Sequence, residues 1–371
     1  MAKKNILLLY ITNFSGHHSA SLAVEKSLKL LSPEIKTLNL NAFHYTSPIS
    51  EKIVNSIYAA VIKRTPKIWD YVYDNLKIKE KIDKFKDAVH KINSPKLKKL
   101  FDQFKPDIIV CTQAYPCGMA AEFKSNYNSK IPLIGVLTDY VPHSYWLYDN
   151  VDYYICPSEE IGRRLVKKGV AEYKIKPLGI PFNPAFSAPV DKNAVLEKLN
   201  FTPGVKTILI MGGGQGLGPI KTIVQSLEKV SYDFQEIIVT GTNKKLYKKL
   251  KKDLKKCKKK ICLLGYAQNI NELMSVADLI VTKPGGITTS EALSKKLPML
   301  IIKPIPGQEA NNTAYLTEQK AAINIEEPKK INLIIENLFA APEKLKRMSE
   351  SCGRIAKPSS GLDIARFILS L

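Results

Sequence analysis

The sequence predicts an α/β protein of two doubly wound domains, each with a parallel sheet covered by helices. Short apolar runs alternate with helical patterns in the first half of the chain, which is typical of buried parallel strands. The same alternation begins again near residue 206, after a proline-rich connector at residues 176–189. With 371 residues, the chain is long enough to build two separate cores.

The first half holds a candidate general base and a second polar candidate residue among its predicted elements. Strands are expected at residues 5–10, 106–111, 131–137 and 151–156, and a helix at residues 20–31. His17 lies in the turn before this helix, whose N-terminus disfavours an imidazolium, so the ring is expected to be neutral, as a general base must be. Asp139 follows the third strand. The alternatives are a turn histidine and a turn-capping aspartate, and the adjacent His18 competes with His17.

The second half repeats the pattern and opens with a glycine-rich loop. Strands are expected at residues 206–211, 261–265, 278–282 and 299–302, and helices at residues 219–230, 270–276, 331–339, 343–355 and 361–371. Gly213, Gly214, Gln215 and Gly216 lie in the loop after the first strand, where backbone amides can close on a phosphate. The loop does not fit G-x-G-x-x-G in register and the chain has no P-loop sequence, which disfavours a dinucleotide dehydrogenase and a P-loop enzyme.

The central stretch of the chain, residues 281–312, combines two strand ends with polar chemistry. Gly285 and Gly286 follow one strand, and Thr288, Thr289 and Ser290 are expected to cap a helix ahead of Glu291. Gln308 and Glu309 follow the next strand. Parallel strand ends share one edge of a sheet, where helix N-termini suit phosphates and carboxylates suit sugar hydroxyls. Two ordinary strand-to-helix turns are the alternative.

Residue patterns that commonly hold a metal are missing from the sequence. No two aspartates have D-x-D spacing, and there is no metalloprotease-type histidine pair. The six cysteines have no C-x-x-C spacing and are interpreted as buried thiols. We therefore expect no metal and no cofactor, and a diphosphate bound without a metal ion.

The composition calls for a partner that tolerates strong positive charge. The net charge is +22 and the pI is near 9.5. Nucleic acid, an anionic membrane and a lysine-rich surface that is simply solvated are the three interpretations. Residues 244–260 hold 11 lysines against one acid, Asp253, and fit a solvated helix face or a membrane contact. No apolar run reaches the ~18 residues that span a bilayer, so a cytoplasmic protein is expected.

Residues 43–105 are basic and aromatic without strand alternation. Between residues 44 and 105 there are 14 Lys and Arg against 7 Asp and Glu. Lys63, Arg64 and Trp69 suit a membrane interface, where cations meet anionic lipid and aromatic rings lie at headgroup level. A solvated helical hairpin with its aromatic side chains in the core is the alternative.

Two motifs carry a resemblance to a known family. Residues 283–291 (KPGGITTSE) and 304–309 (PIPGQE) resemble the donor-site motifs of the bacterial processive diacylglycerol glucosyltransferases and the plastid monogalactosyldiacylglycerol synthases. These are inverting, UDP-sugar-dependent enzymes of the GT-B fold. Gly16-His17 and Thr138-Asp139 match that family in the same order, so the resemblance covers nearly the whole chain. One departure is Phe14-Ser15, where the family usually has more glycine.

The resemblance implies a domain organisation. In a GT-B enzyme, two Rossmann-like domains face a central cleft. Residues 1–182 would then form an acceptor- and membrane-binding domain, residues 183–189 a linker, and residues 190–350 a UDP-sugar-binding domain. Residues 351–371 would form a C-terminal helix that packs back on the first domain, by analogy alone.

It also implies an activity: inverting transfer of a hexose from UDP-glucose or UDP-galactose to a diacylglycerol-type lipid, at the inner face of the cell membrane. His17 would take the acceptor proton, and Asp139 would orient or replace it. His143 and Trp146 would contact the acceptor, and Tyr266 would hold the uracil. The loop glycines, Thr288 and Thr289 would lie near the diphosphate, Glu291 on the ribose, and Gln308 and Glu309 on the sugar.

Two alternatives remain at this stage. A GT-B transferase with another acceptor, such as a polyprenyl-linked sugar or another alcohol, would keep the same C-terminal motifs. A basic nucleic-acid-binding protein would explain the charge but not the two donor motifs, and the sequence shows no helix-turn-helix, RNP or zinc pattern. No nucleic acid is therefore expected as a partner.

Overall fold

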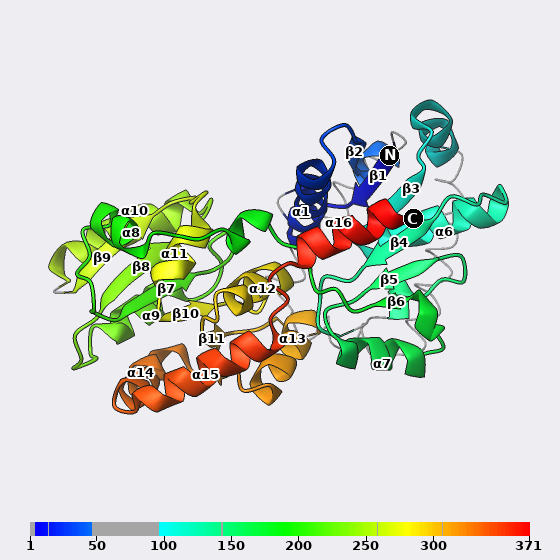
Figure 1. Cartoon of the computed structure of the whole chain (residues 1–371). Coiled ribbons are helices and arrows are strands. Elements are labelled where there is room, and N and C mark those ends of the chain that lie inside the picture. Colours follow the sequence, from blue (N-terminus) through cyan, green and yellow to red (C-terminus); the bar gives the residue numbers. More distant parts are fainter. Residues whose placement is uncertain (1–3, 14, 47–95, 142–143, 258, 306) are drawn as a thin grey trace. The chain divides into compact units, whose positions relative to one another are not determined.

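The computed structural model describes residues 4–13, 15–46, 96–141, 144–257, 259–305 and 307–371. The chain divides into two compact units, which are described separately (Figure 1). Unit 1 comprises Met1–Pro184, Ile305–Gln308 and Ser359–Leu371. Unit 2 comprises Ala185–Pro304 and Glu309–Pro358. The predicted α/β class, with two doubly wound parallel sheets, is confirmed.

Unit 1 is built on a parallel six-stranded sheet with the order β2-β1-β3-β4-β5-β6. Its strands are β1 (Asn5–Tyr10), β2 (Lys36–Asn41), β3 (Ile108–Cys111), β4 (Leu133–Val136), β5 (Tyr153–Ile155) and β6 (Ile175–Lys176). Its helices are α1 (Gly16–Leu31), α2 (Ala42–Thr46), α6 (Ala114–Asn126), α7 (Glu159–Lys167) and α16 (Ser360–Ser370), with short 3₁₀ turns at Ser144–Trp146 and Glu172–Lys174.

Unit 2 is built on a second parallel six-stranded sheet, with the order β12-β11-β10-β7-β8-β9. Its strands are β7 (Thr207–Met211), β8 (Gln235–Val239), β9 (Lys260–Leu264), β10 (Leu279–Thr282), β11 (Met299–Ile302) and β12 (Ala322–Ile325). Its helices are α8 (Lys192–Lys198), α9 (Ile220–Leu227), α10 (Lys244–Asp253), α11 (Ile270–Val276), α12 (Gly286–Ser294), α13 (Gln308–Glu318), α14 (Ile331–Phe339) and α15 (Pro342–Ile355). Short 3₁₀ turns lie at Pro184–Ser187, Leu254–Lys256 and Pro328–Lys330.

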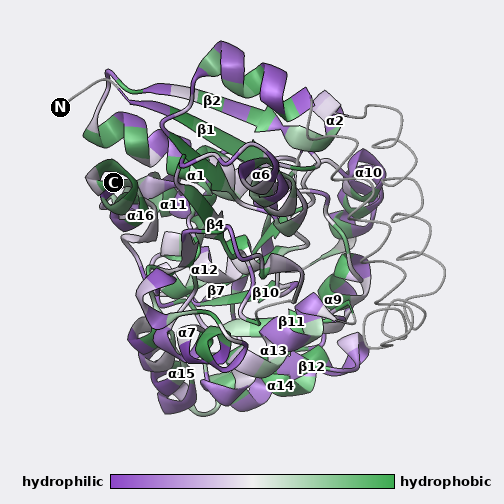
Figure 2. Ribbon diagram, turned by 90° about the vertical axis from the view of Figure 1, so that its right-hand side faces the viewer, coloured by the Kyte–Doolittle hydropathy of each residue, from purple (hydrophilic) through white to green (hydrophobic). Residues whose placement is uncertain are grey.

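The continuous apolar runs of the strands follow from burial on both faces of each sheet. In β1, Leu7 and Leu9 join a core cluster with α6, while Ile6 and Leu8 join a second cluster with α1 and α16. β2 is the edge strand beside β1, and its residues are mostly half-buried and partly polar. Figure 2 shows this contrast, with β1 in the green of apolar residues and β2 carrying purple polar ones. The apolar pattern therefore predicts the central strands and misses β2.

Other missed elements have polar or short sequences. β8 is fully buried although it begins with Gln235 and Glu236. Because these two residues are polar, the apolar pattern does not predict this core strand. β6 has only two residues, and β12 contains Asn324. Tertiary packing, which sequence periodicity does not contain, decides these strands.

Several helix boundaries differ from the prediction, among them those of α9, which spans Ile220–Leu227. α1 begins at Gly16 because the Ser15 side chain accepts a hydrogen bond from the His18 backbone N–H and caps the helix earlier. The lysine-rich helix α10 ends at Asp253. Residues 351–371 do not form one helix, since α15 runs to Ile355 in unit 2 and α16 belongs to unit 1.

α16 packs against α1 within unit 1 (Figure 1). Ser360 Oγ donates to the Ile180 carbonyl at 2.8 Å, and Lys4 Nζ donates to the Leu369 carbonyl at 2.8 Å. Gly361 permits close approach, because a Cβ atom there would lie 2.7 Å from Ser27 Oγ. The end of the chain thus covers one face of the first sheet.

Replacing Gly361 with alanine tests this contact. Gly→Ala inside a helix normally stabilises by about 1 kcal/mol. At Gly361 we expect the opposite sign, a loss of about 1–3 kcal/mol, because the new methyl group would clash with Ser27 Oγ and approach the Phe182 carbonyl at 3.2 Å. The free energy of unfolding in urea measures it. Ser27→Ala in the same chain should recover part of the loss, and a more stable Gly361→Ala chain would contradict the packing.

Candidate functional site

The loops expected to bind the donor lie where the strand order of the second sheet reverses. From β7 the chain proceeds outward to β8 and β9, and from β10 to β11 and β12 on the other side. Met211 and Thr282, the last residues of β7 and β10, are register partners, so the two following loops start side by side. Open α/β sheets bind ligands at such a switch point.

The loop after β7 is a compact turn that only glycine permits. Gly213 and Gly216 have φ values of 68° and 58°, in the left-handed region. A Cβ atom on Gly216 would lie 1.9 Å from the Thr240 carbonyl oxygen. Around Gly213 and Gly214, in contrast, no atom of the described residues, apart from those of the adjacent residues, lies within 4 Å of the Cβ position, and both Gly214 and Gln215 are exposed. The loop therefore presents backbone to open space on one side.

The loop after β10 leads directly into α12. This helix begins at Gly286 with Gly285 as its N-cap and without a capping side chain. The predicted capping by Thr288, Thr289 and Ser290 is wrong, because these residues lie inside the helix. Fully buried Thr289 donates its hydroxyl to the carbonyls of Gly285 and Gly286, each at 3.0 Å, so it braces the turn. Half-buried Thr288 stays a candidate, and the amides of the first turn form a potential anion site.

Glu291 is a half-buried carboxylate on α12. Its side chain has no hydrogen-bond or ion-pair partner among the residues that the structure describes. Burial raises its pKa to about 8, because the charged form has lost water without gaining a partner. Such a carboxylate is suited to accept hydrogen bonds from ligand hydroxyls.

Within unit 2, side chains connect the loop after β10 with the first residues of α13 that belong to this unit. Lys283 Nζ lies 2.9 Å from Glu309 Oε1, with both side chains mostly buried. Asn312 Nδ2 donates to the Pro284 carbonyl at 3.0 Å. Glu309 is therefore already paired on one oxygen, which the sequence did not indicate. Lys283 and Asn312 were missed, although both lie within or directly after the quoted motifs.

Tyr266 and Gln308, both expected at the donor site, belong to different units. Tyr266 lies between β9 and α11 and is 63% exposed, so its ring can still accept a stacked base. Gln308 belongs to unit 1, where its Nε2 donates to Asp139 Oδ2 at 3.0 Å. Its expected contact with the sugar stays a prediction.

The first sheet reverses its strand order between β1 and β3, and His17 lies at that point. It is in the first turn of α1, with Nδ1 3.0 Å from the Thr112 carbonyl oxygen and 3.0 Å from Thr138 Oγ1. Thr112 and Thr138 follow the ends of β3 and β4. Thr112 was not singled out from the sequence, and Thr138 was noted only as part of the Thr138-Asp139 match, although each is a polar residue that follows an apolar run.

The electrostatics of His17 fit a neutral ring. Burial lowers its pKa, while the negative charge of Asp139 and the Thr112 carbonyl act in the opposite direction. Nε2 has no partner among the described residues. His18 instead stacks on Tyr10, with ring centroids 4.3 Å apart, which favours His17 over His18 as the candidate base.

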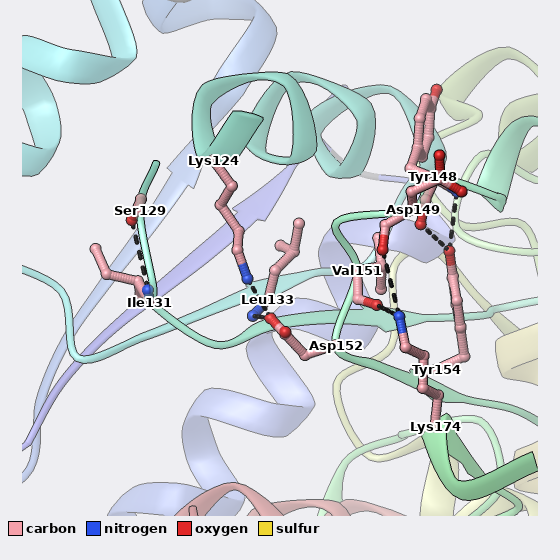
Figure 3. Close-up of polar contacts among 10 residues, drawn as sticks. All are labelled: Lys124, Ser129, Ile131, Leu133, Tyr148, Asp149, Val151, Asp152, Tyr154 and Lys174. Atoms are coloured by element: carbon pink, nitrogen blue, oxygen red, sulfur yellow. Dashed lines mark hydrogen bonds and ion pairs between the residues drawn. The ribbon is translucent and has the colours of Figure 1, made fainter. Parts of the chain in front are cut away.

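Of the acceptor and membrane candidates, Trp146 is the one that lies in the described part of the chain. Trp146 is only 6% exposed and belongs to the core of unit 1, and its expected contact with the acceptor stays a prediction. Tyr154 holds this segment: its hydroxyl donates to the Trp146 carbonyl at 2.9 Å and accepts from Tyr148 N at 3.0 Å. Figure 3 shows Tyr154 reaching to Tyr148, and Asp152 binding Lys124 and the Leu133 backbone nearby. Outside the described residues lie the remaining candidates, His143, Lys63, Arg64 and Trp69.

A search of the described residues for metal ligands found no cluster of three or more His, Cys, Asp or Glu side chains. In the same part of the chain, no helix has the length and apolar character needed to cross a membrane.

Known proteins match both halves of the chain. Residues 17–182 match the monogalactosyldiacylglycerol (MGDG) synthase family, and residues 207–360 match the glycosyltransferase family 28 C-terminal domain. A processive diacylglycerol beta-glucosyltransferase from Bacillus cereus is 33% identical over 276 residues, which are 74% of this chain and 70% of that protein. The protein of the same name from Bacillus licheniformis is 29% identical over 352 residues, 94% of this chain and 90% of that protein.

The fold is similar to that of a GT-B glycosyltransferase. The crystal structure of Acinetobacter baumannii MurG matches with a TM-score of 0.64 and 13% sequence identity, over 99% of this chain and 100% of that chain. At this identity the similarity concerns the fold, and it confirms the predicted GT-B class of two Rossmann-like domains.

Proposed function

Because the chain belongs to the processive diacylglycerol beta-glucosyltransferase family, we propose that it transfers a hexose from a UDP-sugar to a diacylglycerol-type lipid, making a glycolipid. The observation that supports this proposal is that the glycine loop and the loop leading into α12, the helix that carries Glu291, start side by side at the switch point of unit 2. Family membership also favours an enzyme over the nucleic-acid-binding protein that charge alone allowed.

The donor site would use the three features in distinct ways. The amides of the loop around Gly214 and of the α12 first turn would hold the diphosphate, whose negative charge the helix dipole stabilises. Glu291 would accept the ribose hydroxyls, and exposed Tyr266 would stack on the uracil. Lys283, held by Glu309, would bring a positive charge to the same loop. The diphosphate would thus be bound without a metal ion.

The transfer itself needs a base and no covalent intermediate. The acceptor hydroxyl would attack the anomeric carbon on the face opposite the departing UDP, and this inverts the configuration. His17 would take the hydroxyl proton on Nε2. Asp139 would stabilise the resulting imidazolium by its charge.

Transfer assays with His17 and His18 variants test the activity. Purified protein is given radiolabelled UDP-glucose or UDP-galactose with diacylglycerol in mixed micelles, and labelled lipid is separated by chromatography. We expect one of these donors to label the lipid. His17→Ala should lower kcat by about 10²–10⁴-fold, and His18→Ala by a few-fold at most, because His18 stacks on Tyr10 and it is His17 that contacts Thr112.

The outcomes separate two failures. Labelling of a polyprenyl-linked sugar or another alcohol, with no labelled diacylglycerol product, would replace the acceptor and keep the fold and donor site. Full activity of His17→Ala would remove the proposed base.

UDP titration at several pH values tests Glu291. Ribose hydroxyls that donate to the carboxylate favour its ionised form, so UDP should lower the raised pKa of Glu291 and release a proton on binding. UDP affinity should therefore rise with pH and level off above about pH 8. Calorimetry in buffers of different ionisation enthalpy measures both affinity and proton release.

Glu236 provides a matched control for this titration. It is fully buried in β8, neither carboxylate oxygen has a hydrogen-bond partner in the described part of the chain, and burial also raises its pKa to about 8. Glu291→Gln should weaken UDP binding and remove its pH dependence, whereas Glu236→Gln should change neither. A Glu291→Gln chain with unchanged affinity and pH dependence would exclude the ribose contact.

For the membrane, we propose an anionic surface at the inner face, where UDP-sugars are available, with α10 as one contact. Six lysines of α10 are exposed, while Leu250 is buried in the core. The only acid of the helix, Asp253, is already paired with Lys221 at 2.6 Å. Lysines four residues apart repel by about 0.2–0.5 kcal/mol per pair, and anionic lipid would relieve this repulsion. Each lysine near such a surface contributes about 1 kcal/mol.

Vesicle flotation tests the α10 contact in the full chain. We expect binding to phosphatidylglycerol-containing vesicles, weak binding to pure phosphatidylcholine, and loss of binding at high salt. Changing four lysines of α10 to glutamine should weaken this binding more than the same change at four exposed lysines elsewhere in unit 2. The α10 set is Lys244, Lys248, Lys251 and Lys252, and the control set is Lys198, Lys329, Lys344 and Lys346. Equal loss in both variants would show that only total charge matters.

A further inference from the structure

We propose that Thr138, together with the Thr112 carbonyl, holds His17 in the tautomer that leaves Nε2 free to accept a proton. Thr138 would thus be a positioning residue for the base. The inference rests on the proposed function and adds to it two residues, from two different strand ends, that act through the histidine. Three contacts to His17 within unit 1 support it, two to the imidazole ring and one to the main chain.

The first contact decides the tautomer. His17 Nδ1 lies 3.0 Å from the Thr112 carbonyl oxygen. A carbonyl oxygen can only accept a hydrogen bond, so this contact is favourable only when Nδ1 carries the proton. In a neutral imidazole the lone pair then lies on Nε2. The nitrogen that has no partner among the described residues is therefore the one that can act as a base.

The second contact comes from Thr138, whose Oγ1 lies 3.0 Å from the same Nδ1. A hydroxyl oxygen has two lone pairs and can accept from the Nδ1–H group that also faces the Thr112 carbonyl. Thr138 is only 5% exposed, so water has little access to replace this contact. Two acceptors on one N–H group restrict rotation of the ring about its χ2 bond and disfavour the opposite tautomer.

The third contact fixes the backbone of His17. The Thr112 hydroxyl donates to the His17 carbonyl oxygen at 2.8 Å. Thr112 is fully buried and follows β3, so its main-chain position is set by the sheet. Thr112 therefore holds both the ring and the main chain of His17, and Thr138 adds the contact that depends on a side chain alone.

These contacts matter most when the proton moves. As the acceptor oxygen bonds to the anomeric carbon and the bond to UDP breaks, the hydroxyl proton passes to Nε2 and the ring becomes an imidazolium. Its Nδ1–H group is then a stronger donor toward Thr112 and Thr138. Asp139 is the titratable group that acts electrostatically on the ring, and it receives a hydrogen bond from Gln308. Neighbouring His18 faces Tyr10 and Glu25.

Thr138→Val and Thr138→Ser separate the hydroxyl from the shape of the side chain. Thr138→Val keeps the volume and removes the acceptor. We expect kcat to fall about five- to thirtyfold with KM for the UDP-sugar unchanged. The acidic limb of the kcat/KM profile should move to lower pH, because an imidazolium with one acceptor fewer has a lower pKa. Thr138→Ser keeps the hydroxyl and should restore most of the rate and the position of the limb.

Nitrogen NMR of the full chain gives a readout that does not depend on turnover. His17, assigned by comparison with His17→Ala, should show a protonated Nδ1 and an unprotonated Nε2 near neutral pH. In Thr138→Val its pKa should fall, and in Thr138→Ser it should stay close to that of the parent chain. A ring with the proton on Nε2 in the parent chain would overturn the inference.

The two levels of the proposal fail in different ways. If His17→Ala keeps full activity, His17 is not the base and the proposed mechanism is wrong, whatever the NMR shows. If His17→Ala is inactive but Thr138→Val changes neither the pH limb nor the ring titration, the base stands and the role of Thr138 is excluded. A rate loss in Thr138→Val that Thr138→Ser does not restore would also contradict it, because shape rather than the hydroxyl would then matter.

Discussion

The reversal of strand order at the centre of each sheet is the constraint on which both candidate sites depend. Right-handed connections force chain segments on either side of this point to opposite faces, so the loops at the strand ends part and leave room for a ligand. In unit 1, the pairing of β1 with β3 brings His17 to Thr112. In unit 2, the pairing of β7 with β10 brings the glycine loop to the start of α12. Residues far apart in the sequence, such as His17 and Thr112, thus become neighbours because main-chain hydrogen bonds pair the strands that precede them.

Among the described residues, some polar side chains near the strand ends form hydrogen bonds that stabilise the loops, whereas others have no such bond. The first group is structural, and the second is suited to bind a ligand. Thr289 and Asn312 donate hydrogen bonds to main-chain carbonyls of the loop after β10, and these bonds stabilise the conformation of that loop. Lys283 and Glu309 form an ion pair that holds both side chains in place. Glu291 has no such partner among the described residues, so its burial is unfavourable. A bound ligand that donates a hydrogen bond to the carboxylate would offset this.

The same distinction applies to the proposed base. Burial keeps His17 neutral, and the charge of Asp139 limits how far its pKa falls. A base needs both effects, since a charged ring cannot accept a proton and a ring of very low basicity accepts one poorly. The two threonines at the ends of β3 and β4 add orientation to this balance. Orientation and charge therefore come from residues that follow two neighbouring strands, β3 and β4, of one sheet.

By itself, the sequence determined the fold class and the central strands and pointed to most of the proposed donor residues, because apolar runs and the turn residues after them are local signals. β1, β11 and α11 have the bounds that this pattern predicts. Tertiary structure alone decided that β8 is a core strand despite Gln235 and Glu236, that Trp146 is buried, and that two threonines hold His17. These depend on which distant segments pack together, and no local periodicity records that.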